Sequence, residues 1–180
     1  EIDTVAIDSA IKIAELNPSL KGKVELRMQD NPKDILRGIL TNDELVDLTV
    51  CNPPFHASLA EARSGSVRKL TNLTKKKIAR PILNFGGQNN ELWCDGGEER
   101  FVRDMIFQSK NLASTCFLFS SLISKESSLR SVYDALRKVE AKEIKTIPMG
   151  QGNKISRIVA WTFLSREQQE KWVRMRWGKL

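Results

Sequence analysis

The sequence holds few of the residues that build metal centres and disulfide frameworks. Its 180 residues include one histidine, His56, and three cysteines, Cys51, Cys94 and Cys116. None of the cysteines has the C-x-x-C spacing of a zinc or redox motif, and three thiols cannot all pair. We therefore expect no metal site, and we expect reduced thiols in a cytoplasmic protein.

Long apolar runs are also missing. No stretch approaches the roughly 18 consecutive apolar residues that cross a bilayer, so we expect no membrane partner. The apolar share of 41% and the charged share of 28% are ordinary for a folded globular protein and argue against disorder. A chain of 180 residues is about one domain's worth, so we expect residues 1–180 to form a single domain.

The net charge of +7 is concentrated in two segments. Residues 61–80 carry seven cationic side chains against one acid, Glu61, and the tail 165–180 is also basic. Clustered cations on a slightly acidic body are typical of a phosphate-binding surface, although a solvated surface loop with a polar last helix is the alternative. The candidate RNA-binding residues are Arg63, Arg68, Lys69, Lys75, Lys76, Lys77 and Arg80.

Hydrophobic periodicity predicts alternating helices and strands. The expected helices are 4–16, 32–40, 98–110 and 127–139, with a last helix capped by Ser165; the expected strands are 24–28, 45–51, 115–120, 144–149 and 155–164. This alternation predicts an α/β sheet with parallel central strands and a C-terminal antiparallel hairpin. Residues 56–96 lack clear periodicity and are longer than most connections, which predicts a substrate-side loop or insert.

The tetrapeptide Asn52-Pro53-Pro54-Phe55 follows the expected strand 45–51, at the sheet edge where α/β proteins bind ligands. Two prolines stiffen the loop and leave its carbonyls free to accept hydrogen bonds. The Asn52 side chain and the Pro53 carbonyl together suit an exocyclic NH₂ group, while Phe55 suits the flat ring that bears it. An amine held in this way directs its lone pair out of the ring plane, so the loop is suited to direct methyl transfer. A proline turn with a capping asparagine is the structural alternative.

Four segments together resemble the ribosomal RNA adenine-N6 methyltransferase F family, which is related to the eukaryotic enzymes that act on U6 snRNA. These segments are residues 51–58, 83–88, 91–98 and 150–152. The resemblance implies a class I, Rossmann-like methyltransferase fold, S-adenosylmethionine as methyl donor and 23S ribosomal RNA as partner. It implies that Asn52 to Phe55 bind the target amine, with Asn52 also near the donor, and that Glu1 binds the donor's ribose hydroxyls.

The sequence departs from the family in one respect. No G-x-G joins a strand to a helix, so the family's first strand and glycine-rich donor loop have no counterpart. We therefore expect an N-terminally truncated sheet and a half-built donor site, with weak or no donor binding and no activity in this chain alone.

Three alternatives stay open at this stage. The tetrapeptide is shared with DNA adenine and protein glutamine methyltransferases, and the missing donor loop also fits a catalytically silent RNA-binding module. Among single residues, His56 suits a loop position better than a substrate contact, and Glu98 suits the first turn of a helix. Trp172 and Trp177 suit either stacking on RNA or packing of the last helix.

Overall fold

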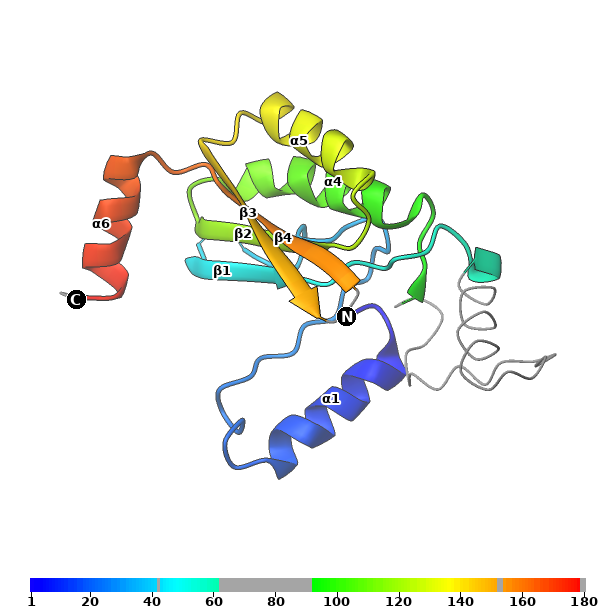
Figure 1. Cartoon of the computed structure of the whole chain (residues 1–180). Helices are drawn as coiled ribbons and strands as arrows, with labels where there is room; N and C mark the ends of the chain where they lie inside the picture. The colour runs from blue at the N-terminus through cyan, green and yellow to red at the C-terminus, as the bar shows by residue number, and fades with distance from the viewer. Residues whose placement is uncertain (42, 62–91, 152–153, 179–180) are drawn as a thin grey trace. The chain divides into compact units, whose positions relative to one another are not determined.

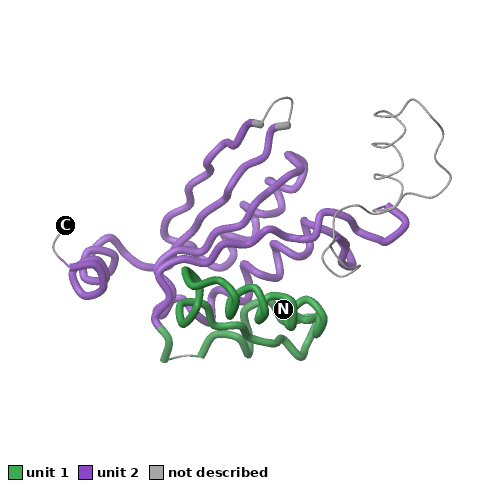
Figure 2. Tube along the Cα trace, turned by 90° about the horizontal axis from the view of Figure 1, so that it is seen from below, with its two compact units in different colours: residues 1–44 green, residues 45–180 purple. Residues whose placement is uncertain are grey.

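The computed structural model describes residues 1–41, 43–61, 92–151 and 154–178. The chain divides into two compact units, residues 1–44 and residues 45–180, which Figure 2 shows in different colours. Every strand assigned in the described ranges belongs to the second unit. The sheet that carries the candidate site is therefore built without residues 1–44.

Helix α1, Thr4–Leu16, confirms the helix predicted for residues 4–16. It begins where Asp3 caps it, since the Asp3 carboxylate accepts the backbone N–H groups of Val5 (2.8 Å) and Ala6 (3.1 Å). The helix ends at Leu16, and its C-cap Asn17 is extended, as is typical of a residue before a proline. No residue of α1 is fully buried, so local capping rather than a packed core defines this helix.

The strand predicted for 24–28 and the helix predicted for 32–40 are wrong. Alternating apolar residues form a strand only beside another strand, and the described part of this unit offers none. Arg27 instead pairs with the Glu44 carboxylate, at 2.6 Å for one of the two contacts. The second segment forms turns, and Gly38 adopts a left-handed φ of +75° that interrupts a helix.

The second unit confirms the predicted class of sheet. The strands whose bounds lie in the described residues are β1 (Val46–Cys51), β2 (Cys116–Ile123), β3 (Glu143–Gln151) and β4 (Lys154–Thr162). The helices bounded in the same way are α4 (Gly97–Ser109), the 3₁₀ turn η1 (Lys110–Leu112), α5 (Ser128–Lys138) and α6 (Arg166–Arg176). The strand order is β1-β2-β4-β3. Strands β1 and β2 are parallel, while β4 runs antiparallel to both of its neighbours, so the C-terminal hairpin folds back and places β4 inside the sheet.

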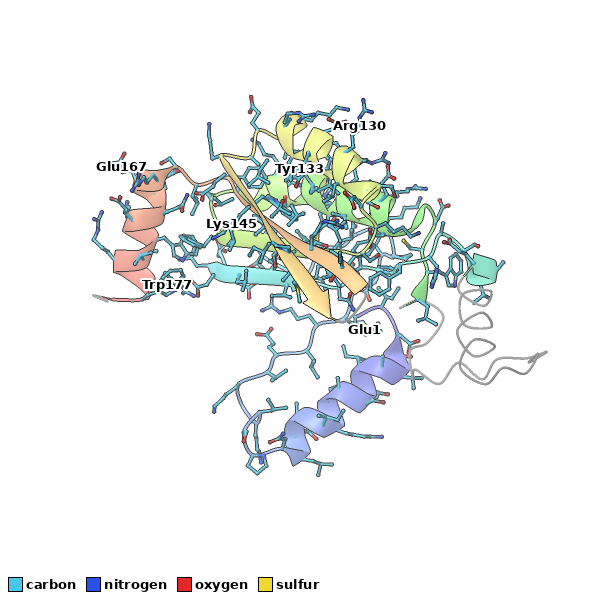
Figure 3. All side chains as sticks on the ribbon, viewed as in Figure 1. Glu1, Arg130, Tyr133, Lys145, Glu167 and Trp177 are labelled. Carbon is cyan, nitrogen blue, oxygen red and sulfur yellow. The ribbon has the colours of Figure 1, made fainter. Side chains whose placement is uncertain are left out.

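Helices α4 and α5 lie on one face of this sheet (Figure 1). The core lies between them and the strands, where the Phe119 and Trp161 rings stack with centroids 5.7 Å apart. The Trp161 indole N–H donates to the Ser109 hydroxyl of α4 (3.0 Å). On α5, Tyr133 (Figure 3) makes a 2.7 Å hydrogen bond with Thr146 of β3. Aromatic side chains thus fill the space between the helices and the sheet, and the polar atoms of Trp161 and Tyr133 have hydrogen-bond partners there.

Strand β1 is less buried than its apolar sequence predicts. Leu48 and Val50 are 50% and 78% exposed, on an edge strand of the described sheet. Helices α4 and α5 cover the opposite face, to which the alternate residues of β1 point. The apolar run 45–51 predicts a buried strand, and this prediction is wrong for the face that carries Leu48 and Val50.

The last helix confirms its predicted start. Ser165 and Gln168 form a reciprocal capping box, in which the Ser165 hydroxyl accepts the Gln168 N–H and the Gln168 side chain accepts the Ser165 N–H.

Helix α6 is attached to the amino end of β1 through Asp47. The Asp47 carboxylate accepts the indole N–H groups of Trp172 (2.8 Å) and Trp177 (3.1 Å), the latter labelled in Figure 3, and the Arg176 guanidinium (2.8 Å). Phe117 packs against both indole rings. The Arg176 guanidinium is the main reason that the pKa of Asp47 falls to about 2. Both tryptophans therefore serve packing, one of the two roles that the sequence left open.

Candidate active site

The Asn-Pro-Pro-Phe loop leaves the sheet where β1 ends at Cys51. Because β1 and β2 are parallel neighbours, the loop lies beside the end of β2, as the sequence predicts. Pro53 is buried and anchors the loop, Pro54 and Phe55 are half-buried, and Asn52 is exposed. Within the described residues the Asn52 side chain has no hydrogen-bond partner, so its amide oxygen is available to a ligand.

A second segment runs alongside this loop. His56 forms an isolated parallel bridge with Trp93, in which the His56 N–H donates to the Leu92 carbonyl (3.2 Å) and the Cys94 N–H donates to the His56 carbonyl (3.1 Å). Residues 92–98 are thereby held next to the residues that follow Phe55. Two of the four segments that carry the family resemblance are thus neighbours in space.

Gly97, the first residue of α4, makes the close approach between these segments possible. A side-chain carbon at this position would lie 3.1 Å from the Ala57 nitrogen and 3.3 Å from the His56 carbonyl carbon. The φ of +62° at Gly97 also lies in the left-handed region that glycine adopts without strain. A side chain here would press on the backbone two residues beyond Phe55, so Gly97 helps to set the path of the candidate loop.

Glu98 ties the start of α4 to the end of β2. It is 1% exposed, and its carboxylate accepts the backbone N–H groups of Ser124 (2.7 Å) and Lys125 (3.1 Å) as well as the Ser124 hydroxyl. Ser124 directly follows β2. Glu98 therefore has a positioning role at the helix start and no free oxygen directed toward solvent.

Glu61 provides a second connection across the same edge. Its carboxylate accepts the Ala57 N–H (2.8 Å) and lies 3.4 Å from the Lys125 ammonium. The hydrogen bond from Ala57 is the main cause that lowers the pKa of Glu61. The His56 Nδ1 atom is 3.8 Å from the Glu61 carboxylate, beyond hydrogen-bond distance, and this buried atom has no hydrogen-bond partner in the described ranges.

The three thiols are poor nucleophiles in this environment. Burial raises the pKa of Cys51 and Cys94, and it raises the pKa of Cys116 to about 12. All three cysteines are free, and each keeps its proton at neutral pH. The site edge therefore offers hydrogen-bond acceptors and an aromatic ring rather than an activated thiolate.

Other predicted site residues belong to the first unit or lie outside the described residues. Glu1 belongs to the first unit, where its carboxylate accepts the N–H groups of Ile2 (2.8 Å) and Asp3 (2.9 Å). The basic residues from Arg63 to Arg80 lie outside the described residues. The roles assigned to Glu1 and to the basic segment therefore remain predictions.

Four contributors to the site edge were not predicted from the sequence. They are Gly97, Ser124, Lys125 and the carboxylate of Glu61. Gly97 lies in the Gly96-Gly97-Glu98 run, so the paired glycines ahead of a helix were the available signal. The other three act through contacts between distant segments, and no local pattern marks them.

The described ranges offer neither a metal centre nor a membrane span. They hold no group of three or more histidine, cysteine, aspartate or glutamate side chains arranged to bind a metal ion. No helix among these residues is long and apolar enough to cross a membrane.

The strand order, the hairpin and the loop after β1 define a class I methyltransferase domain. A family model described as RNA methyltransferase matches residues 1–165. The chain belongs to this family of RNA methyltransferases.

Known proteins similar to the chain carry related names. Ribosomal RNA large subunit methyltransferase F of Cytophaga hutchinsonii is 52% identical over 177 residues, which cover 98% of this chain and 55% of that protein. The chain spans about half the length of the curated relatives it matches.

Solved structures show the same fold. The hMettl16 catalytic domain in complex with MAT2A 3'UTR hairpin 1 matches with a TM-score of 0.73 and 26% identity, over 92% of this chain and 55% of that one. The N-terminal domain of human METTL16 in complex with SAH matches with a TM-score of 0.63 and 22% identity, over 92% of this chain and 51% of that one. At this lower identity the second match concerns the fold alone.

Proposed function

We propose that this chain carries the amine-binding part of an enzyme that methylates N6 of an adenine in 23S ribosomal RNA, with S-adenosylmethionine as donor. The observation that carries the proposal is the exposed, unpaired Asn52 at the carboxyl end of β1, on a loop anchored by the buried Pro53. The RNA methyltransferase family and the name of the Cytophaga relative support RNA, and specifically large-subunit ribosomal RNA, as the substrate.

In the proposed reaction, the adenine amine donates one hydrogen to the Asn52 side-chain oxygen and the other to the Pro53 carbonyl. The ring lies against Phe55, which is half-buried and therefore keeps part of its surface accessible. S-adenosylmethionine, when bound, supplies an electrophilic methyl group on a sulfonium. Asn52 and the Pro53 carbonyl would direct the amine nitrogen toward that methyl group. After the transfer, which would leave the donor's sulfur neutral, the nitrogen would release one proton to solvent.

The chain's residues contribute mainly by holding the amine in place. Positioning of this kind can supply a large part of a rate enhancement, because the loop is ordered before the substrate binds. Glu61 and Gly97 support the backbone just beyond Phe55, through the hydrogen bond from Ala57 and through the close approach to Ala57. On the donor side, we propose that Glu1 binds the ribose hydroxyls, for which two carboxylate oxygens are suited.

Labelled methyl transfer by the whole protein tests the proposal. We expect label in unmodified 23S ribosomal RNA as N6-methyladenosine, and none in duplex DNA or in protein. Asn52→Ala should lower the transfer rate at least about 100-fold while leaving RNA affinity within about twofold, because the substitution removes one of two acceptors that orient the amine. Asn111→Ala is the matched control. Asn111 is an exposed asparagine in η1, which follows the C-terminal end of α4, whereas Gly97 begins that helix.

The basic segment gives the complementary test. Replacing Lys75, Lys76 and Lys77 with alanine should weaken RNA binding and reduce its salt dependence by up to about one unit of slope for each phosphate that the segment no longer binds. Label in DNA or in a protein glutamine would redirect the proposal to those substrates. RNA binding without transfer by the whole protein would favour a silent RNA-binding module.

A further inference from the structure

The C-terminal hairpin reaches beyond the rest of the sheet on the side of the candidate site. The last residue of β2, Ile123, pairs with Arg157 of β4, so the β4 residues before Arg157 have β3 as their paired neighbour. Because β4 is antiparallel to β2, these residues lie past the end of β2, and Figure 1 shows the two strands reaching past the arrowhead of β1. We call residues 149–151 and 154–156 the hairpin arm.

Neither packing nor backbone conformation in the described residues requires glycine at position 150. Gly150 belongs to β3, its φ lies outside the left-handed region, and a side-chain carbon added to it would meet nothing within 4 Å. Glycine inside a strand is destabilising relative to alanine, so an open, unstrained glycine here weakens the arm without any packing benefit. A bare strand position of this kind is typical of close approach by a ligand.

One face of the arm combines this bare backbone with an exposed apolar side chain. Gly150 pairs directly with Ile155, which is 66% exposed, and the Arg157 side chain follows on the same face. The other face carries Met149, which is 43% exposed and pairs with Ser156. On one face of the arm the exposed apolar residue, Ile155, lies beside Gly150, whereas on the other face Met149 lies beside Ser156.

Two ion pairs and a hydrogen bond connect the Gly150 face with the candidate loop. Arg157 is paired with Glu126 at 2.9 Å, and Glu126 follows Lys125 in the connection after β2. Lys125 lies 3.4 Å from Glu61, whose carboxylate holds the Ala57 N–H beyond the Asn-Pro-Pro-Phe loop. The Gly150 face of the arm and the Asn-Pro-Pro-Phe loop are thus connected, through these contacts and the backbone between Lys125 and Glu126, at the same edge of the sheet.

We propose that Gly150 and Ile155 form a platform for a nucleobase of the substrate RNA adjacent to the target adenine. A flat base can lie on the bare peptide of Gly150 and against the Ile155 side chain, as flipped or single-stranded bases do on apolar and aromatic surfaces. This inference rests on the proposed function, and it adds a second RNA contact on residues that the structure describes.

Variants on the two faces of the arm test the platform in the whole protein, with a 23S ribosomal RNA transcript as the probe. We expect Gly150→Leu to weaken RNA binding about tenfold and Ile155→Ala about fivefold, because each disturbs a contact of stacking strength. Met149→Ala, on the opposite face, should bind within twofold of the wild type. The melting temperature of Gly150→Leu should equal or exceed that of the wild type, since the position is open and leucine suits a strand better than glycine.

Separate outcomes bear on the platform and on the proposed function. If the wild type methylates the transcript while Gly150→Leu and Ile155→Ala bind and react normally, the platform is wrong and the proposed function stands. Equal weakening by Met149→Ala and Ile155→Ala would also overturn the platform, because the faces would not differ. A lower melting temperature in Gly150→Leu would reveal an internal role for the glycine and overturn it too. If the wild type neither methylates nor binds the transcript, the proposed function and the platform that rests on it both fail.

Discussion

The polar side chains at the two ends of β1 differ in whether they have hydrogen-bond partners among the described residues. At the amino end, the Asp47 carboxylate accepts hydrogen bonds from Trp172, Arg176 and Trp177, which all belong to helix α6 or the residue after it. At the carboxyl end, Asn52 is exposed and has no hydrogen-bond partner in the described ranges. The difference fits the division of roles proposed above, in which the first end serves stability and the second end would bind the target amine.

The largest effect that sharpens this comparison is expected at Gly97, on the carboxyl side. Gly97→Ala should lower the free energy of unfolding by about 2–3 kcal/mol, because it adds a left-handed alanine and a contact with the Ala57 backbone. Methyl transfer should fall as well at temperatures where the variant is folded, since the backbone after Phe55 is displaced. Denaturant unfolding and initial rates measure the two effects.

Gly178→Ala is the matched control for this substitution. Gly178 has a φ of +73° with nothing within 4 Å of an added side-chain carbon, so it tests backbone strain without the contact. Its cost should be about 1 kcal/mol, with normal methyl transfer. Equal losses in the two variants would show that the approach to Ala57 has no effect of its own.

A smaller effect is expected at the amino end. Asp47→Ala leaves two indole N–H groups and the Arg176 guanidinium without their acceptor, which should cost about 1–2 kcal/mol. The cost is limited because the Asp47 side chain is 36% exposed and water can replace part of the missing acceptor. Methyl transfer at neutral pH should stay within twofold of the wild type. A large loss of transfer without unfolding would contradict the division of roles between the two ends of β1.

The smallest effect is the pH dependence of the same group. The pKa of Asp47 is lowered to about 2 in the folded chain, below the value of about 3.9 in an unfolded chain, so the unfolded state binds the proton first. Its contribution to stability is therefore complete above about pH 4 and is lost as the pH falls toward 2. Asp47→Asn should flatten the stability profile in this window. Urea unfolding at several pH values measures the free energy of unfolding as a function of pH. If the wild type and Asp47→Asn lose stability equally between pH 4 and pH 2, Asp47 is not the group responsible.

Much of the fold follows from local patterns in the sequence. The apolar spacing over residues 4–16 predicts α1, and the Ser165 cap predicts the start of α6. The position of the Asn-Pro-Pro-Phe loop at the carboxyl end of β1 also follows, because a strand pattern precedes two prolines. These features depend on residues that are neighbours in the sequence.

The errors arise where distant contacts decide the outcome. Residues 24–28 alternate like a strand, but no neighbouring strand pairs with them in the described chain. The exposure of Val50 depends on which face the helices cover, and the contact of Gly97 with Ala57 depends on the path of two segments 40 residues apart. Local patterns do not contain this information, so the contacts that support the candidate loop could not be predicted from them.

The edge position of β1 has a consequence for solubility. In the described sheet, β1 and β3 are the two edges. Strand β3 carries Lys145 and Pro148, which discourage the addition of another strand, whereas β1 has neither residue type between Val46 and Cys51 and exposes Leu48 and Val50. Self-association of this chain should therefore begin by pairing along β1, and Leu48→Lys or Val50→Lys should suppress it.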